Sequence, residues 1–303
     1  MTSDSDSIIP ADAWDTHIHV FDPEAFPYAA PRSYTPKPAL LKDYPVSITG
    51  CRNIVIVQAT VQGKSPDSLL ADLANKTLGS SIQLRGLCTI DVTSISDGEL
   101  DRLHAAGVRG VRMHEISWGH GSQMPPSAIA EKIRAAAAKV ARLGWVMDVF
   151  SDIRSWGAMA DMLRGLPQGV KLIADHCGGT YPGEEKLEEF EKFIALVRDG
   201  LLYVKLSGFD RLYPGHEGGM DVMEPIVKAI VAAGPDRVIY GSDWPHTQLG
   251  ISRKGKTDEQ RLTEIEDFRN VDDNSQIRKL REWITDDETW RRLWCGTPRK
   301  LFS

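Results

Sequence analysis

Two histidines near the start of the chain, His17 and His19, have a spacing suited to chemistry. Both lie on the predicted strand Ala13–Val20, and side chains two residues apart on a strand leave the same face. His176 follows a second predicted strand, and Asp243 follows a third, in the run Gly-Ser-Asp-Trp-Pro-His. Imidazole and carboxylate groups transfer protons, polarise carbonyl groups and bind metal ions. These four residues are therefore the candidate catalytic set.

The elements that would position this set recur along the chain. Short β-branched apolar runs alternate with stretches of helical periodicity, which is typical of repeated βα units. The predicted strands are Ala13–Val20, Asn53–Ala59, Leu84–Ile90, Gly110–His114, Trp145–Phe150, Lys171–Asp175, Leu202–Leu206 and Arg237–Tyr240. The predicted helices are Pro66–Lys76, Asp97–Ala106, Ala128–Arg142, Ile153–Arg164, Glu184–Asp199 and Met220–Ala233.

Eight such units predict an α/β fold of the (β/α)8 TIM-barrel type, whose active sites form at the carboxyl ends of the strands. A doubly wound sheet is the alternative, but no G-x-G-x-x-G turn follows the first strand. Two segments interrupt the repeat. Residues 21–45 are rich in proline, and we expect them to form a fixed wall of the pocket that includes Tyr34. Residues 248–276 are rich in charge, and we expect them to form a mobile lid or a solvated excursion.

The composition is that of one globular domain. The chain has 303 residues, of which 42% are hydrophobic and 26% charged, and its net charge of -6 gives no diffuse attraction to nucleic acid or anionic lipid. We expect a disordered N-terminus over residues 1–10 and one barrel domain over 11–303. The sequence has neither a signal-peptide pattern nor an apolar run long enough to span a membrane, which predicts a cytoplasmic protein. Its four cysteines are expected to be buried free thiols, and the oligomeric state stays open.

Several runs together carry a family resemblance. They are Asp15–Phe21 with its H-x-H, Asn53–Gln58, Gly107–Arg112, Asp175-His176, Lys205–Leu212, Val238–His246 and the terminal Gly296–Phe302. In this order they resemble the amidohydrolase superfamily, in the amidohydrolase-related branch that includes 2-pyrone-4,6-dicarboxylate lactonase and sugar-lactone hydrolases. The resemblance spans most of the chain.

This resemblance implies a hydrolase that opens a carboxylated lactone or related cyclic ester. Asp243 would activate water, while His17, His19 and His176 would polarise the carbonyl group. The small carboxylated substrate would be bound by cationic residues and by positions similar to substrate contacts of the branch: Tyr34, Thr60, Arg112, Lys205, Arg211 and His246. His114, His120 and His216 are expected to be incidental. Phe150 stands where the lactonase has tyrosine, which predicts a different substrate.

The resemblance leaves metal use open between two alternatives. Binuclear members use a carboxylated lysine on strand four, but that strand ends here in Arg-Met-His, and strand five lacks the histidine of the mononuclear decarboxylases. We expect no required cofactor, as in the lactonase-like branch. The alternative is a zinc ion held by His17, His19 and Asp243, with water and His176, since such nitrogen and oxygen sites suit zinc. That alternative would serve a zinc-dependent decarboxylase of an aromatic or unsaturated acid; a binding protein without catalysis is a third hypothesis.

Overall fold

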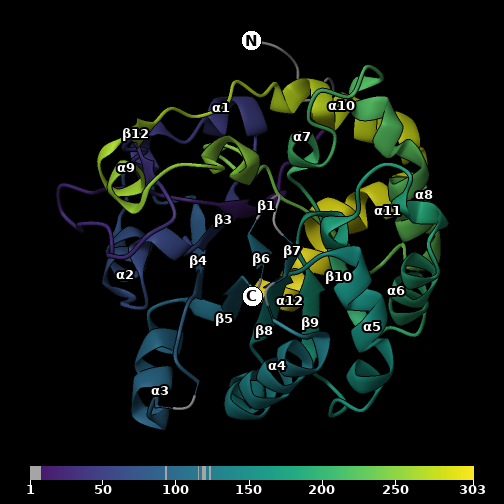
Figure 1. Cartoon of the computed structure of the whole chain (residues 1–303), viewed down its shortest axis with the longest axis horizontal. Coiled ribbons are helices and arrows are strands. Elements are labelled where there is room, and N and C mark those ends of the chain that lie inside the picture. Colours follow the sequence, from purple (N-terminus) through teal and green to yellow (C-terminus); the bar gives the residue numbers. More distant parts are fainter. Residues whose placement is uncertain (1–7, 93, 115, 118–120, 123) are drawn as a thin grey trace.

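The computed structural model describes residues 8–303 except 93, 115, 118–120 and 123. Within them, eight parallel strands form one sheet in the order β1-β3-β4-β5-β8-β9-β10-β11, with helices around it (Figure 1). Their bounds are β1 Trp14–Ile18, β3 Asn53–Val57, β4 Gln83–Cys88, β5 Val108–His114, β8 Val146–Phe150, β9 Lys171–Ala174, β10 Leu202–Leu206 and β11 Val238–Tyr240. This is the predicted (β/α)8 barrel in a single domain.

The barrel closes where β1 meets the segment that follows β11. Ile18 forms a parallel bridge with Trp244. The amide of Asp243 donates to the carbonyl of His17 at 2.9 Å, and the amide of His19 donates to the carbonyl of Trp244 at 2.8 Å. The backbone contacts that complete the barrel therefore place Asp243 beside the histidine pair.

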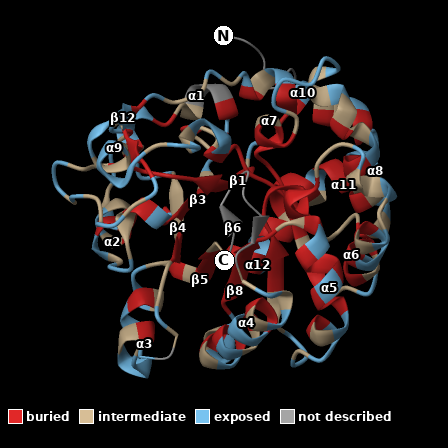
Figure 2. Cartoon of the chain, viewed as in Figure 1, coloured by how far each residue is buried: buried red, intermediate tan, exposed pale blue. Residues whose placement is uncertain are grey.

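The described residues form the helices α1 Val46–Thr49, α2 Asp67–Ala74, α3 Asp97–Ala105, α4 Pro126–Val140, α5 Ile153–Arg164, α6 Glu188–Arg198, α7 Phe209–Leu212, α8 Glu224–Ala233, α9 Asp258–Thr263, α10 Asp273–Trp283, α11 Asp287–Arg291 and α12 Thr297–Phe302. Most of them lie around the outside of the sheet (Figure 1). Buried residues concentrate on the strands and on the helix sides that face them (Figure 2). In α5, for example, Trp156, Ala160 and Leu163 are buried at the three-and-four spacing of an amphipathic helix.

Side chains fill the interior of the barrel in layers. An apolar layer consists of Trp14, Val55, Val57, Leu87, Val146, Ile173, Ile239, Leu301 and Phe302. The last two belong to α12, and the Phe302 carbonyl accepts a hydrogen bond from Arg85 Nε at 2.9 Å, so the end of the chain closes the bottom of the barrel. Because side chains alternate along a strand, Asp148, two residues after Val146, also points inward, and so does Asp175 after Ile173. A polar layer therefore lies above the apolar one.

An irregularity in β1 decides which way the histidines point. The register with β3 shifts between Asp15 and Ile18. Trp14 packs inside the barrel, whereas Ile18 packs between the sheet and the helices, although strict alternation would place both on one face. The shift turns His17 and His19 inward, where both are buried.

The two segments that interrupt the βα repeat pack against each other. Strand β2 (Thr35–Pro36) pairs in parallel with β12 (Ile265–Glu266), and the Thr35 hydroxyl donates to the carbonyl of Arg261 at 2.7 Å. The expectation that 248–276 is a solvated excursion is wrong for the part that faces the barrel. Glu266 is buried there, because Arg253 pairs with its carboxylate at 2.9 Å. A second pair of short strands, β6 (Ile116–Ser117) and β7 (Gly121–Ser122), follows β5.

Both ends of the chain contain structure that the sequence did not predict. Helices α10, α11 and α12 lay outside the predicted set, and Ile277 and Leu280 bury their side chains there. Within the expected disordered terminus, Ile9 is buried and the carbonyl of Ile8 accepts a hydrogen bond from Trp290 at 2.6 Å; residues 1–7 lie outside the described part. None of the described helices is long and apolar enough to cross a membrane.

Candidate active site

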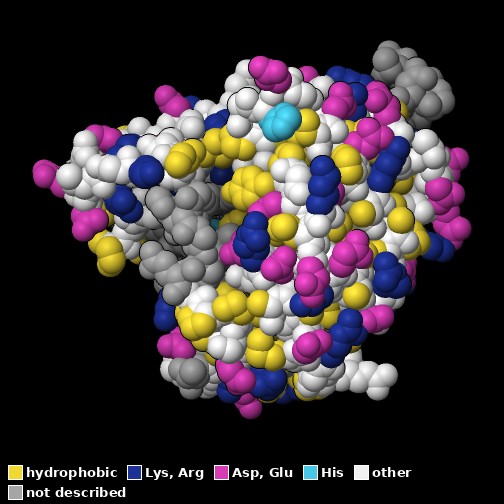
Figure 3. Space-filling view, turned by 45° about the vertical axis from the view of Figure 1, so that its right-hand side comes forward, with side chains coloured by type: hydrophobic (Ala, Val, Ile, Leu, Met, Phe, Trp, Pro, Cys, Tyr) yellow, Lys and Arg dark blue, Asp and Glu magenta, His cyan; other side chains and the backbone are white. Residues whose placement is uncertain are grey.

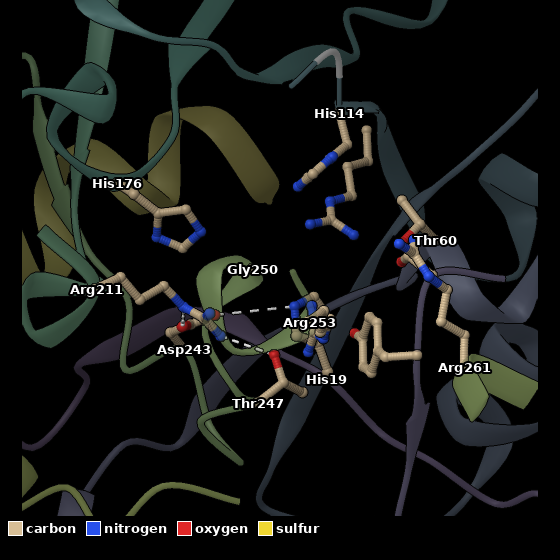
Figure 4. Close-up of a pocket in the computed structure, with 13 residues that line it drawn as sticks. His19, Thr60, His114, His176, Arg211, Asp243, Thr247, Gly250, Arg253 and Arg261 are labelled. Carbon is tan, nitrogen blue, oxygen red and sulfur yellow. Dashed lines mark hydrogen bonds and ion pairs between the residues drawn. The ribbon is translucent and has the colours of Figure 1, made fainter. Parts of the chain in front are cut away.

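A pocket opens at the carboxyl ends of the strands and contains about 720 Å³ of space, including the part open to solvent. Its lining is dominated by polar and cationic side chains (Figure 4). The lining residues are His19, Ser33, Tyr34, Thr60, Arg112, His114, His176, Arg211, Asp243, Thr247, Gly250, Arg253 and Arg261. Acidic and basic side chains are interspersed over the outer surface (Figure 3), whereas the pocket lining combines four arginines with one acid. The pocket therefore suits a small anionic molecule.

His17 and His19 form a close pair at the base of this pocket. Their Nε2 atoms are 3.3 Å apart, and the Asp243 Oδ1 atom lies 3.8 Å from the first and 3.9 Å from the second. His19 Nδ1 is 2.6 Å from the carbonyl of Val57. Since a carbonyl only accepts, Nδ1 carries the proton, and the neutral ring presents a lone pair at Nε2. This differs from the donor role that the sequence analysis gave His19.

Asp243 is held by an ion pair and by an unusual backbone conformation. Arg211 Nε lies 2.5 Å from its Oδ2 atom, and its φ of +66° is left-handed. Non-glycine residues in that region cost free energy and are found at functional sites. Burial opposes the charged form, but Arg211 and the surrounding histidines outweigh it and hold the pKa of Asp243 well below its usual range. The carboxylate is ionised at neutral pH, as a proton acceptor must be.

His176 reaches the pocket from the turn after β9. Its Nδ1 atom lies 2.8 Å from the Ser207 hydroxyl, and its ring packs 4.8 Å from that of His17, centroid to centroid. Gly208 has a φ of +58°, and a Cβ atom there would stand 2.7 Å from the His176 ring. Only glycine fits this close approach. The Ser207–Gly208 pair thus fixes the ring against the pocket.

Lys205 lies beneath the pocket and is not among its lining residues. It is fully buried, and its Nζ atom lies 2.8 Å from Asp148, 3.1 Å from Asp175 and 3.0 Å from His17 Nδ1. Burial disfavours its charge, but the two carboxylates outweigh that penalty and raise the pKa of Lys205. Lys205 therefore positions His17 from beneath the pocket, whereas the sequence predicted that it contacts the substrate.

Four of the five other predicted substrate contacts line the pocket. Tyr34, Thr60, Arg112 and Arg211 line the pocket as predicted, whereas His246 lies outside it and pairs with Asp273 at 3.2 Å. His216 is a loop residue that accepts a hydrogen bond from Gly218, and His120 lies outside the described residues. The assignment of Tyr34, Thr60, Arg112 and Arg211 as substrate contacts stays a prediction.

Six lining residues are not among the predicted site residues: Ser33, His114, Thr247, Gly250, Arg253 and Arg261. His114 lies two residues after Arg112 on β5, so strand alternation alone could have found it. Arg253 stacks over the Tyr34 ring at 3.7 Å and pairs with Glu266. Neither contact has a local sequence signal, because Tyr34 lies in a distant segment of the chain and Glu266 lies 13 residues after Arg253.

The donor set near His17 fits a metal ion. The Nε2 atoms of His17 and His19 and one Asp243 oxygen lie within 4.8 Å of one another, and His19 already directs a lone pair to this point. His17 can do the same when its Nδ1–H donates to Asp175, 3.1 Å away. When Lys205 instead donates to Nδ1, the proton moves to Nε2, and His17 can donate it to His19 Nε2, 3.3 Å away. The same residues therefore fit both a zinc site and a metal-free site.

The histidine pair predicts a pH dependence of stability in metal-free protein. Burial lowers the pKa of His17 to about 3 and holds the pKa of His19 well below its usual value. The unfolded chain takes up these protons near pH 6.5, and the folded chain does not. The free energy of unfolding therefore decreases as pH falls through this range. Between pH 7.5 and 5.5, His19 should account for about 1.4 kcal/mol of lost unfolding free energy.

Urea unfolding of the wild type and of His19→Gln at these two pH values checks this expectation. The variant should lose less stability on acidification, while groups such as Asp15, whose raised pKa of about 6 acts in the opposite direction, contribute equally to both proteins. Identical pH dependence in the two proteins would mean that His19 is protonated in the folded state.

Comparison with known proteins places the chain in a family. Residues 14–303 match the amidohydrolase family model. The chain is 31% identical over 258 residues to 2-pyrone-4,6-dicarboxylate hydrolase of Comamonas testosteroni, covering 80% of this chain and 79% of that one. It is 31% identical over 301 residues to 4-sulfomuconolactone hydrolase of Rhizobium radiobacter, covering 97% and 91%. A solved apo structure from Agrobacterium tumefaciens shares the fold, with a TM-score of 0.76 at 20% identity over 97% and 96% of the two chains.

The chain therefore belongs to the amidohydrolase family and is a hydrolase. The family resemblance that the sequence motifs carry is confirmed.

Proposed function

We propose that this protein hydrolyses a carboxylated lactone, with Asp243 as the base that activates water. The observation that carries the proposal is the Asp243 carboxylate, paired with Arg211 and lying within 3.9 Å of two histidines, in a pocket lined by four arginines. Two relatives that cover most of the chain are named as hydrolases of lactones with anionic groups, which supports the same substrate class.

The chemistry follows from the protonation states. A water molecule donates one proton to Asp243 Oδ1, which directs its oxygen at the lactone carbonyl. As the water attacks, Asp243 takes one proton, and His17 and His176 donate hydrogen bonds to the developing oxyanion. The ring C–O bond then breaks, and the leaving oxygen takes the proton back from Asp243. The products are a hydroxyl or enol group and a carboxylic acid, which keeps the second proton of the water and releases it to solvent at neutral pH.

The reaction is proposed to need no metal. If zinc is bound, His17, His19 and Asp243 would hold it, and it would supply Lewis-acid polarisation of the carbonyl group. In either case Arg112 and Arg211 provide the positive charge that a substrate carboxylate requires.

A substrate panel with metal analysis of the same sample tests the proposal. Purified protein is dialysed against a chelator and assayed with carboxylated lactones, uncharged lactones and aromatic acids. We expect turnover of carboxylated lactones and retention of most activity after chelation. Complete loss on chelation that zinc alone restores would show a required metal, and release of CO₂ from the acids would favour the zinc-dependent decarboxylase instead.

A further inference from the structure

The four arginines of the pocket differ in how far their charges are compensated. Arg211 pairs with Asp243, and Arg253 pairs with Glu266. Among the described residues, Arg112 and Arg261 have no carboxylate within ion-pair distance. Two guanidinium groups are therefore available to anionic groups of a ligand.

Arg112 supplies one of these groups from the end of β5. It is 8% exposed, and its Nη1 atom donates to the carbonyl of Gln58 at 2.9 Å. Its Nε–H is buried and has no hydrogen-bond partner in the described part of the chain. An unpaired buried donor is costly, so a ligand oxygen that accepts from it would relieve that cost.

Arg261 supplies the other group from α9, outside the barrel strands. Its Nε atom donates to the carbonyl of Lys256 at 3.2 Å, and its two terminal nitrogens have no partner among the described residues. Figure 4 shows Arg261 across the pocket from Arg211 and Asp243. Its free N–H groups thus lie away from the groups assigned to bond cleavage.

The position of Arg261 is set by contacts with the segment 21–45. The Thr35 hydroxyl donates to the Arg261 carbonyl at 2.7 Å, and Arg32 donates to the neighbouring carbonyl of Leu262 at 2.5 Å. The adjacent Arg253 is held between Glu266 and the Tyr34 ring. The helix α9 is therefore anchored over the pocket, which lowers the entropy cost of using its arginine for binding.

We propose that Arg261 binds a second anionic group of the substrate, at the end remote from the bond that is cleaved, while Arg112 binds the first. The inference rests on the proposed function for the identification of the substrate as a lactone, and it assigns Arg261 as the residue that selects for the second anionic group. One group meets the barrel floor and the other meets the wall formed by residues 248–276. The second group is a carboxylate or a sulfonate, since both match a guanidinium fork.

Equilibrium binding of stable ring acids tests this assignment without any turnover. Calorimetry compares benzene-1,3-dicarboxylate, 3-sulfobenzoate and benzoate on the wild type, Arg261→Met and Arg261→Gln. The matched control is Lys254→Met, which removes a positive charge from an exposed position of the same segment. The wild type and the control should bind the better of the two dianions at least 10-fold more tightly than benzoate, and this preference should fall below about threefold in both Arg261 variants. The dianion with the larger preference identifies the second group.

The proposal is overturned if the wild type binds benzoate as tightly as both dianions, or if the preference survives in the Arg261 variants. An intact preference in a protein that opens no lactone would overturn the proposed function and leave the second anion site standing. The two failures are therefore distinguishable.

Discussion

Replacing Asp243 by asparagine is expected to lower kcat for lactone hydrolysis by about 10²–10⁴-fold, the scale of a lost general base. The amide has nearly the shape of the carboxylate but cannot accept a proton from water at neutral pH. The effect should fall on kcat rather than on KM, because the lost step is proton transfer. Steady-state kinetics on the best lactone of the panel measures it.

The ion pair between Asp243 and Arg211 requires a control for this variant. Thr247→Val removes a second side-chain partner of Arg211, which lies 2.8 Å from its Nη2 atom, and leaves the carboxylate in place. If Asp243 is the base, Thr247→Val should cost at most about one hydrogen bond, roughly 10-fold in kcat/KM. Equal losses in the two variants would mean that Asp243 acts by positioning Arg211.

Replacing Lys205 by methionine is expected to lower the free energy of unfolding by about 3–5 kcal/mol, the cost of breaking a buried ion pair by removing one partner. The change leaves Asp148 and Asp175 without the cation that lies within 3.1 Å of both. It also removes the ammonium that faces His17 Nδ1. Urea unfolding at neutral pH measures the loss.

Lys192→Met is the matched control, because Lys192 pairs with Glu188 on the exposed surface of α6 and such pairs contribute little. Its unfolding free energy should stay close to that of the wild type. If Lys205→Met instead kept the wild-type stability and raised KM, Lys205 would be the substrate contact that the sequence suggested.

The sequence was enough to bring the candidate catalytic groups together, because their signals are local; their catalytic roles stay a prediction. An H-x-H at the end of the first strand, and single polar residues after strands six and eight, are enough to bring four side chains to one end of a barrel. The contact that completes the site, the Asp243 amide on the His17 carbonyl, then follows from barrel closure.

The sequence could not separate the layers inside the barrel. Lys205 and Arg112 both point inward near strand ends, but Lys205 is buried among carboxylates while Arg112 lines the pocket. Strand alternation specifies the face of a side chain and not its depth, which depends on the shear of the whole barrel. His246 shows the same limit, since it is close to Asp243 in sequence yet turns toward Asp273.

The part of segment 248–276 that faces the barrel was misjudged because charge was taken as a sign of solvent exposure. Arg253 and Glu266 neutralise each other inside the protein, and Arg253 also covers Tyr34. Long-range ion pairs leave no periodicity in a sequence, so Arg253 and Arg261 could be found only from the fold.

The fate of oxygen-18 from labelled water tests whether this protein opens its lactone by hydrolysis. A lactone with two anionic groups is turned over in H₂¹⁸O, and the product is analysed by mass spectrometry, with Asp243→Asn as the inactive reference. Hydrolysis through water activated by Asp243 predicts a ring-opened product that carries one oxygen-18 atom in its new carboxylate. A product without the label, as lactone isomerisation would give, or a product shortened by loss of CO₂, would contradict the account.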